Sequence, residues 1–371
     1  MLGGLILILG CATAAITYHQ VKNWKHSLTQ SNFIRHAEIY QHVFEERFKH
    51  YCHTVDLVAE LFRASDWVTR EEFRKFVSKT LRQHPEIQAL EWIPRVPHKE
   101  RKSFETRVCQ EGVVDFEFTE RTVQGKIQPA KAREEYFPVH YVEPLNGNEE
   151  ALGFDLASNS KRLAALKKAS REGHVTATSR ITLVQETAGQ YGFLLFSPVR
   201  TGATAPDDGK KLYGSQQGFA LGVFRIGELV ESTIGDFPSR GLNLRFIDQS
   251  APTDEKFLYM HKAQFPRENR QKAVIRNPPK EKDILEIRLP LSVADRSWTM
   301  IARPTTDFFA ARSQWEAPLA SGAIVVFSAL STAFVVVVGH RAQCYLKLAD
   351  EREVTKHELK ASNEKLSAML D

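Results

Sequence analysis

Two uncharged apolar runs near the ends of the chain constrain its fold more than any other feature. The first, Leu2–Thr17, is short for a bilayer span and reaches the required length if Tyr18 and His19 lie at the interface. The second, Ala317–Gly339, matches the thickness of the hydrocarbon core. We therefore expect two transmembrane helices. A cleaved signal peptide is the alternative for the first run, although no basic segment follows Met1, and a true start upstream of Met1 stays open.

Basic residues after the second run predict the orientation. His340, Arg341 and Lys347 follow it directly, so the positive-inside tendency places the C-terminal tail in the cytoplasm. Lys22 and Lys25 argue weakly for the reverse, but a loop of about 300 residues crosses a membrane largely regardless of such charges. We expect a multi-pass protein of the inner (cytoplasmic) membrane, with its middle region in the periplasm or outside the cell.

The middle region begins with a long amphipathic helix. Its apolar residues recur at alternating steps of four and three, which predicts one helical stripe. The members are Phe33, Ala37, Tyr40, Phe44, Phe48, Tyr51, Val55, Val58 and Phe62. The stripe could pair with a second subunit or pack against the domain that the helix carries, and the sequence leaves both readings open.

After a second helix, Arg70–Arg82, the hydrophobic period changes to that of strands. Short aliphatic and aromatic runs bounded by Gly, Pro or Asn predict two antiparallel sheet units, hence an α+β fold. The expected strands are Ile87–Val96, Val113–Thr122, Tyr136–Val142, Gly153–Leu156, Arg180–Val184, Gly192–Val199, Gly218–Arg225, Leu242–Asp248, Lys256–His261, Ile284–Leu291 and Ser297–Arg303, with helices at Ser160–Glu172, Ile226–Ile234 and Asp307–Trp315.

These patterns divide the chain into six segments. We expect a transmembrane helix at 1–19, a stalk helix at 20–69, a membrane-distal sheet unit at 70–215, a membrane-proximal unit at 216–316, a transmembrane helix at 317–339 and a cytoplasmic coiled-coil signalling helix at 340–371. The heptads of the last segment are interrupted by polar residues, so this coiled coil would be weak.

Three segments of the middle region resemble a known family in order and spacing: Ile87–Glu105, Arg133–Ser158 and Gly173–Val199. Over roughly residues 70–230 they closely resemble the CHASE family, an extracellular sensory domain found in front of histidine kinases and nucleotide cyclases. The resemblance implies a long stalk helix that carries two PAS-like units in tandem, with small ligands bound in the membrane-distal one. Plant members are receptors for adenine-type hormones.

The resemblance also implies ligand-binding residues. An aspartate of the family corresponds to Asp155 and a threonine to Thr178. A carboxylate on a sheet lined by Phe154, Trp92 and Tyr141 could accept hydrogen bonds from a ligand whose apolar parts those rings bury. The alternative for Asp155 is a structural pair with a nearby arginine.

The sequence offers little support for other functions. The formal charge of +5 comes from 50 basic and 45 acidic residues without a basic patch, which disfavours nucleic acid as a partner. We find no catalytic or dinucleotide motif and expect neither enzyme activity nor a cofactor. His50 and His53 share a helix face without a third ligand, so we expect no metal. Cys52 and Cys109 could pair outside the cell, but we do not favour a disulfide between them. We interpret His357 as a solvent-exposed helix residue.

The favoured function is therefore that of a receptor input module. It would bind an extracytoplasmic small molecule and, as a homodimer, pass a conformational signal to an output domain after Asp371 or to a separate partner protein. The alternative is a membrane-anchored scaffold or assembly protein that has no ligand.

Overall fold

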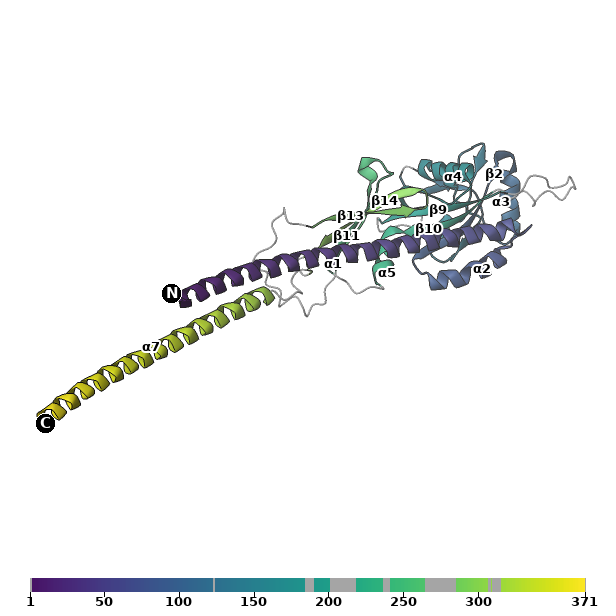
Figure 1. The fold of residues 1–371 in the computed structure, drawn as a ribbon. Coiled ribbons are helices and arrows are strands. Elements are labelled where there is room, and N and C mark those ends of the chain that lie inside the picture. Colours follow the sequence, from purple (N-terminus) through teal and green to yellow (C-terminus); the bar gives the residue numbers. More distant parts are fainter. Residues whose placement is uncertain are drawn as a thin grey trace. The chain divides into compact units, whose positions relative to one another are not determined.

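The computed structural model describes residues 2–122, 124–183, 190–200, 218–235, 241–263, 285–305, 308 and 315–370 (Figure 1). These residues form two compact units. One contains Phe33–Ala310, and the other contains the two chain ends, Met1–Asn32 and Ala311–Asp371.

The unit of chain ends consists of helices. Helix α1 (Leu2–Arg63) begins with the first apolar run, and α7 (Glu316–Leu370) contains the second. Both are long and apolar enough to span a membrane, and both expose large apolar side chains, such as Ile8 and Phe334, as lipid-facing helices do. The two helical runs expected at 1–19 and 317–339 are thus present, and span and tail form one continuous helix in α7. Pairing of the tail into a coiled coil stays a prediction.

The stripe of the stalk helix packs within the chain. All nine members from Phe33 to Phe62 are buried, and they join the core cluster to which both sheets contribute. The Phe62 ring stacks on Trp92 of the first sheet at 3.7 Å between centroids, and Phe48 meets Trp298 of the second at 5.3 Å. Of the two readings left open, core packing inside one subunit is the one that the structure shows.

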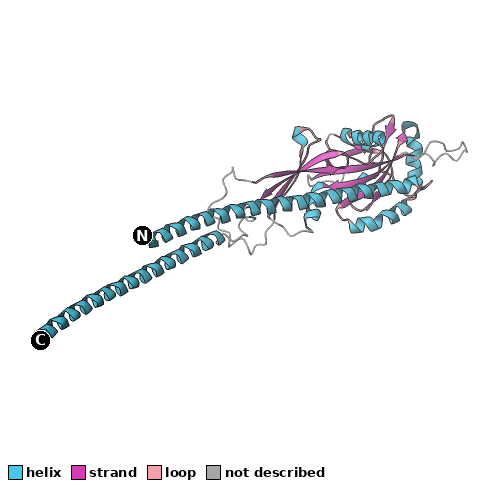
Figure 2. Ribbon diagram, viewed as in Figure 1, coloured by secondary structure: helices cyan, strands magenta, loops and turns pink. Residues whose placement is uncertain are grey.

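The first sheet lies between two helical layers (Figure 2). Its strands run antiparallel in the order β6 (Tyr141–Glu143), β1 (Ile87–Pro94), β10 (Gly218–Arg225), β9 (Tyr191–Val199) and β7 (Thr176–Ala177), and β8 (Ile181–Thr182) also pairs with β9. One face packs on α1 and on α2 (Arg70–Gln83), and the other packs on α4 (Ser160–Glu172). Two core clusters therefore lie one on each face of this sheet, and a third, smaller cluster forms around Phe104, Phe118 and Tyr136.

The second sheet has four antiparallel strands, in the order β12 (Phe257–His261), β11 (Leu242–Asp248), β14 (Arg296–Pro304) and β13 (Ile287–Val293). Helix α5 (Ile226–Gly235) connects it to β10. The remaining elements are two small ribbons, β2 (Val96–Pro97) with β5 (Glu135–Tyr136) and β3 (Thr119–Arg121) with β4 (Ile127–Pro129), the helix α3 (Arg101–Gln110), and the 3₁₀ turns η1 (His98–Glu100), η2 (Glu149–Ala151), η3 (Leu156–Ser158) and η4 (Thr253–Glu255).

The expected boundary between residues 215 and 216 is wrong. The strand Gly218–Arg225, assigned to the second unit, lies in the middle of the first sheet between β1 and β9. The chain returns to the first sheet before it starts the second, and no local pattern marks such a return because strand pairing is a long-range choice.

One further expectation needs correction, one helix was not expected, and one expected helix lies largely outside the described residues. The segment Gly153–Leu156 is no strand: only isolated bridges occur at Phe154 and Asp155, and η3 follows. Helix α3, Arg101–Gln110, was not foreseen, because only Phe104 and Val108 are buried and its hydrophobic signal is weak. Most of the expected helix Asp307–Trp315 lies outside the described residues.

Candidate functional site

A small cavity lies between the first sheet and α4. Its two charged lining residues are Glu91 of β1 and Arg162 of α4, and the rest of its wall is apolar, with Phe154, Leu194 and Leu221 among the contributors. Its free volume is about 10 Å³, which is room for about one water molecule. Two ionisable groups in such a wall distinguish this cavity from ordinary core packing.

The alternation of β1 directs Glu91 into this cavity. Successive strand residues face opposite sides of a sheet. Ala89 and Ile93 belong to the cluster on the α4 side, whereas Leu90 and Trp92 belong to the cluster on the α1 side. Glu91 shares the side of Ala89 and Ile93 and is only 2% exposed.

Arg162 reaches the cavity from the buried face of α4. Asn159 caps this helix by accepting hydrogen bonds from the backbone N–H groups of Lys161 and Arg162. The Arg162 Nη2 donates to the carbonyl oxygen of Thr182 at 3.2 Å, and the guanidinium lies 5.0 Å from the centre of the Phe154 ring. Its Nε has no hydrogen-bond partner among the described residues.

Burial dominates the electrostatics of this pair. It raises the pKa of Glu91 to about 8, an effect that the positive charge of Arg162 only partly offsets. It lowers the pKa of Arg162 to about 10, with Glu91 acting in the opposite direction. Among the described residues, no ion pair within 4.0 Å joins the two, and besides burial only the charge of Arg162 acts on the pKa of Glu91. Perturbed, incompletely paired ionisable groups at a cavity are typical of functional sites.

Asp155, expected to bind a ligand, lies beside this cavity in a different environment. Its side chain is fully buried, and its Oδ1 accepts hydrogen bonds from the backbone N–H groups of Phe137 (2.8 Å) and Ala157 (3.1 Å). Its Oδ2 lies 3.2 Å from Nη1 of Arg133. Burial raises the pKa of Asp155 against these contacts. The Asp155 carboxylate therefore links η3 to the backbone at Phe137 and to the side chain of Arg133. These contacts agree with the alternative considered for Asp155, a structural pair with an arginine.

Gly153 sets the course of the chain at this point. Its φ is +79°, and a Cβ at this position would lie 2.3 Å from the carbonyl oxygen of Glu117. Only glycine meets both conditions without strain. The turn delivers Phe154 to the cavity and Asp155 to its backbone partners.

The other expected site residues divide between the two faces of the sheet. Trp92 and Tyr141 belong to the cluster packed against α1 and α2, whereas Phe154 belongs to the cluster on the α4 side. Thr178 is buried, and its Oγ1 accepts a hydrogen bond from the backbone N–H of Leu194 at 3.1 Å. Of the five residues, the structure places only Phe154 in the wall of the cavity. Ligand contacts by the other four stay a prediction.

The two charged residues of the cavity were missed, although both leave a trace in the sequence. Glu91 is the single charge inside the apolar strand Ile87–Pro94. Arg162 precedes Ala165, Leu166 and Ala169 by three, four and seven positions, so it shares the buried helix face with them. A charge at an inward position is the available signal, because buried charges are rare unless paired or functional.

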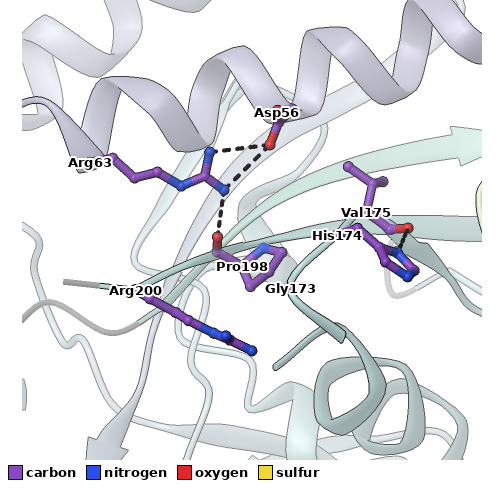
Figure 3. A pocket seen from close by; sticks show the side chains of 7 residues that line it. All are labelled: Asp56, Arg63, Gly173, His174, Val175, Pro198 and Arg200. Carbon is purple, nitrogen blue, oxygen red and sulfur yellow. Dashed lines mark hydrogen bonds and ion pairs between the residues drawn. The ribbon is translucent and has the colours of Figure 1, made fainter. Parts of the chain in front are cut away.

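A second, larger hollow adjoins the end of α1 and is shown in Figure 3. Its volume is about 340 Å³, and its lining includes Asp56, Arg63, His174, Pro198 and Arg200. The charged groups at this hollow have partners within the fold: Arg63 pairs with Asp56 at 3.3 Å and donates to the Pro198 carbonyl oxygen at 2.6 Å. Because ligand pockets are mainly apolar with a few free polar groups, the smaller cavity is the better candidate despite its size.

Comparison with known proteins identifies the middle region. The family model for the CHASE domain matches residues 66–259, which is more than half of the chain. No curated protein sequence matches the chain. The match to the CHASE family model covers the residues that line the cavity and the five site residues expected from the sequence.

Solved structures of sensory domains are similar at a remote level. Methyl-accepting chemotaxis protein X shares 11% identity at a TM-score of 0.42, and the match covers 75% of this chain and 98% of that one. The ligand-binding domain of the amino acid chemoreceptor PctC of Pseudomonas aeruginosa PAO1, in complex with GABA, shares 10% (70% and 93% covered, TM-score 0.36). The ligand-binding domain of chemoreceptor CtaA of Pseudomonas fluorescens, in complex with L-isoleucine, shares 10% (78% and 98% covered, TM-score 0.40).

Proposed function

The chain belongs to the CHASE family of extracellular sensory domains, and on this premise we propose that it is the ligand-binding input module of a transmembrane receptor. The two apolar helices would anchor it in the inner membrane, with the sheet units outside and the tail of α7 in the cytoplasm. A homodimer and a cytoplasmic output domain or partner complete the proposal.

The observation that carries the proposal is the pair Glu91 and Arg162 in one buried cavity. An ionisable group taken out of water without full pairing costs free energy, and a ligand that supplies the missing partner recovers it. Arg162 suits a carboxylate or another acceptor, and Glu91 suits a donor such as an ammonium or an N–H group. The ligand class is therefore a small molecule that carries both a hydrogen-bond acceptor and a hydrogen-bond donor.

The same strand connects the cavity to the stalk. Glu91 faces the cavity, and its neighbour Trp92 stacks on Phe62 of α1 on the opposite face. Because the cavity has room for about one water molecule, a larger ligand must displace its walls. A displacement of β1 would shift Trp92 against α1, and through this contact the binding energy would bias the helix that continues to Leu2.

The test is ligand binding by the full-length chain in detergent. We would measure thermal unfolding and calorimetric titration with neutral amino acids, small carboxylates and adenine derivatives, for the wild type and for Glu91→Gln and Arg162→Met. A ligand that stabilises the wild type should bind at least tenfold more weakly to both variants, since each loses a charge-assisted contact.

Glu38→Gln is the matched control. Glu38 is exposed on the stalk, so this substitution makes the same chemical change as Glu91→Gln but outside the cavity. It should bind as the wild type does. If both cavity variants bind a stabilising ligand as well as the control does, the cavity is not the site. If no compound of the panel stabilises the wild type, the scaffold alternative gains support instead.

A further inference from the structure

Two histidines that are far apart in the sequence meet at the junction of α1 and α2. His50 lies on α1, and His84 is the C-cap residue of α2. Their Nε2 atoms are 3.1 Å apart, and their ring centres are 4.7 Å apart. Two imidazole nitrogens that face each other at this distance either share one proton or bind one metal ion.

A carboxylate orients one of the two rings. The Nδ1 of His84 lies 3.2 Å from Oε1 of Glu86, and the hydroxyl of Tyr51 donates to the same oxygen at 2.7 Å. A proton on Nδ1 then leaves Nε2 of His84 as a lone-pair donor directed at His50. Metal-binding histidines almost always have this second partner, because it fixes the tautomer and the ring orientation.

The distance also suits a metal. Imidazole nitrogens bind transition metals at about 2.0 to 2.1 Å, so two of them 3.1 Å apart subtend roughly 100° at the ion, between octahedral and tetrahedral angles. His50 is exposed, which leaves coordination positions open to water. No cluster of three or more histidine, cysteine, aspartate or glutamate ligands occurs among the described residues, so water would complete the shell.

The charges around the pair are balanced. Glu86 is 5% exposed and lies 3.6 Å from Arg47, whose positive charge opposes a cation. His53, one turn along α1 from His50, also faces the pair.

We propose that His50 and His84 form a binding site for a divalent transition metal ion, Zn²⁺ in the first instance, which links α1 to α2. Helical spacing places His50 and His53 on one face of α1, but no third metal ligand stands on that face. The structure supplies a different second ligand from α2, 34 residues away. Since α2 packs beside the first sheet, a metal at this junction would stiffen the attachment of that sheet to the stalk.

Calorimetric titration of the metal-stripped, full-length chain with Zn²⁺ tests the site. We expect one equivalent of Zn²⁺ to bind to the wild type and to raise its melting temperature, because the ion binds only the folded arrangement. His50→Gln and His84→Gln should each weaken this binding at least tenfold. Co²⁺ should give an absorption spectrum of nitrogen coordination in the wild type that is absent from both variants.

His42→Gln is the control, because His42 is an exposed histidine on the same helix outside the pair. It should bind Zn²⁺ as the wild type does. His50 is exposed, so His50→Gln keeps the test valid should His84→Gln unfold. Absence of Zn²⁺ binding in the wild type, or binding unchanged in His50→Gln, would show that the two rings only share a hydrogen bond.

Discussion

Replacing Glu91 by glutamine should change how the stability of the protein depends on pH. The pKa of this carboxyl is 4.5 in an exposed chain and about 8 in the folded protein, because burial disfavours the charged form. A folded pKa above the unfolded value means that the stability from this group is fully present below pH 4.5. That stability is lost as the pH rises through about 8. Glutamine keeps the shape of the side chain but cannot ionise.

The expected magnitude follows from the two pKa values. Each pH unit between them corresponds to about 1.36 kcal/mol, and integration from pH 5 to pH 8 gives a loss of about 3.5 kcal/mol for the wild type. We apply no reduction of this stability loss for screening by water, because the Glu91 side chain is only 2% exposed. In a domain of this size about 1 kcal/mol shifts the melting temperature by roughly 2 °C, so the effect is roughly 7 °C. Arg162 stays charged throughout, since its pKa is about 10.

The assay is thermal unfolding of the full-length wild type and of Glu91→Gln at pH 5, 6, 7 and 8. Other carboxylates titrate in both proteins and cancel in the difference. The melting temperature of Glu91→Gln should rise relative to that of the wild type by several degrees across this range, and Glu38→Gln should follow the wild type. Parallel profiles for the wild type and Glu91→Gln would refute the reasoning, because they would mean that Glu91 is already ionised and paired in the folded protein.

Three further predictions concern other parts of the fold. Phe48→Ala should lower the free energy of unfolding by about 3 to 5 kcal/mol in denaturant titrations and leave self-association unchanged, because the ring is buried within the chain; a loss of dimer without loss of stability would contradict this. Asp155→Ala should cost about 2 to 4 kcal/mol, since it leaves the N–H of Phe137 unpaired, whereas Asp155→Asn keeps the acceptor and should cost less than half as much; equal melting temperatures for the two variants would contradict the structural role. A cysteine at exposed Lys102 should react with a membrane-impermeant reagent in whole cells and one at Lys356 should not, and labelling of Lys356 alone would reverse the proposed orientation.

The family and the α+β architecture were accessible from the sequence because they depend on local patterns. Uncharged runs of bilayer length, a stripe with helical spacing and short alternating runs each carry their own signal. The order of the motifs between Ile87 and Val199 carried the resemblance that the family model confirms. The predicted boundary at residue 215 was wrong because the sequence of a strand does not determine which strands it pairs with. Gly218–Arg225 pairs with β1 on one side and β9 on the other.

The sequence by itself determined that two apolar helices flank an α+β sensory domain and that a long amphipathic helix carries it, because hydrophobic period and length are properties of single segments. Only the tertiary structure decided what that helix packs against and which polar groups meet. Glu91 and Arg162 come from a strand and a helix that are 71 positions apart, and His50 and His84 from two helices that are 34 apart. Their proximity arises from the packing of both faces of one sheet, and no spacing along the chain encodes it.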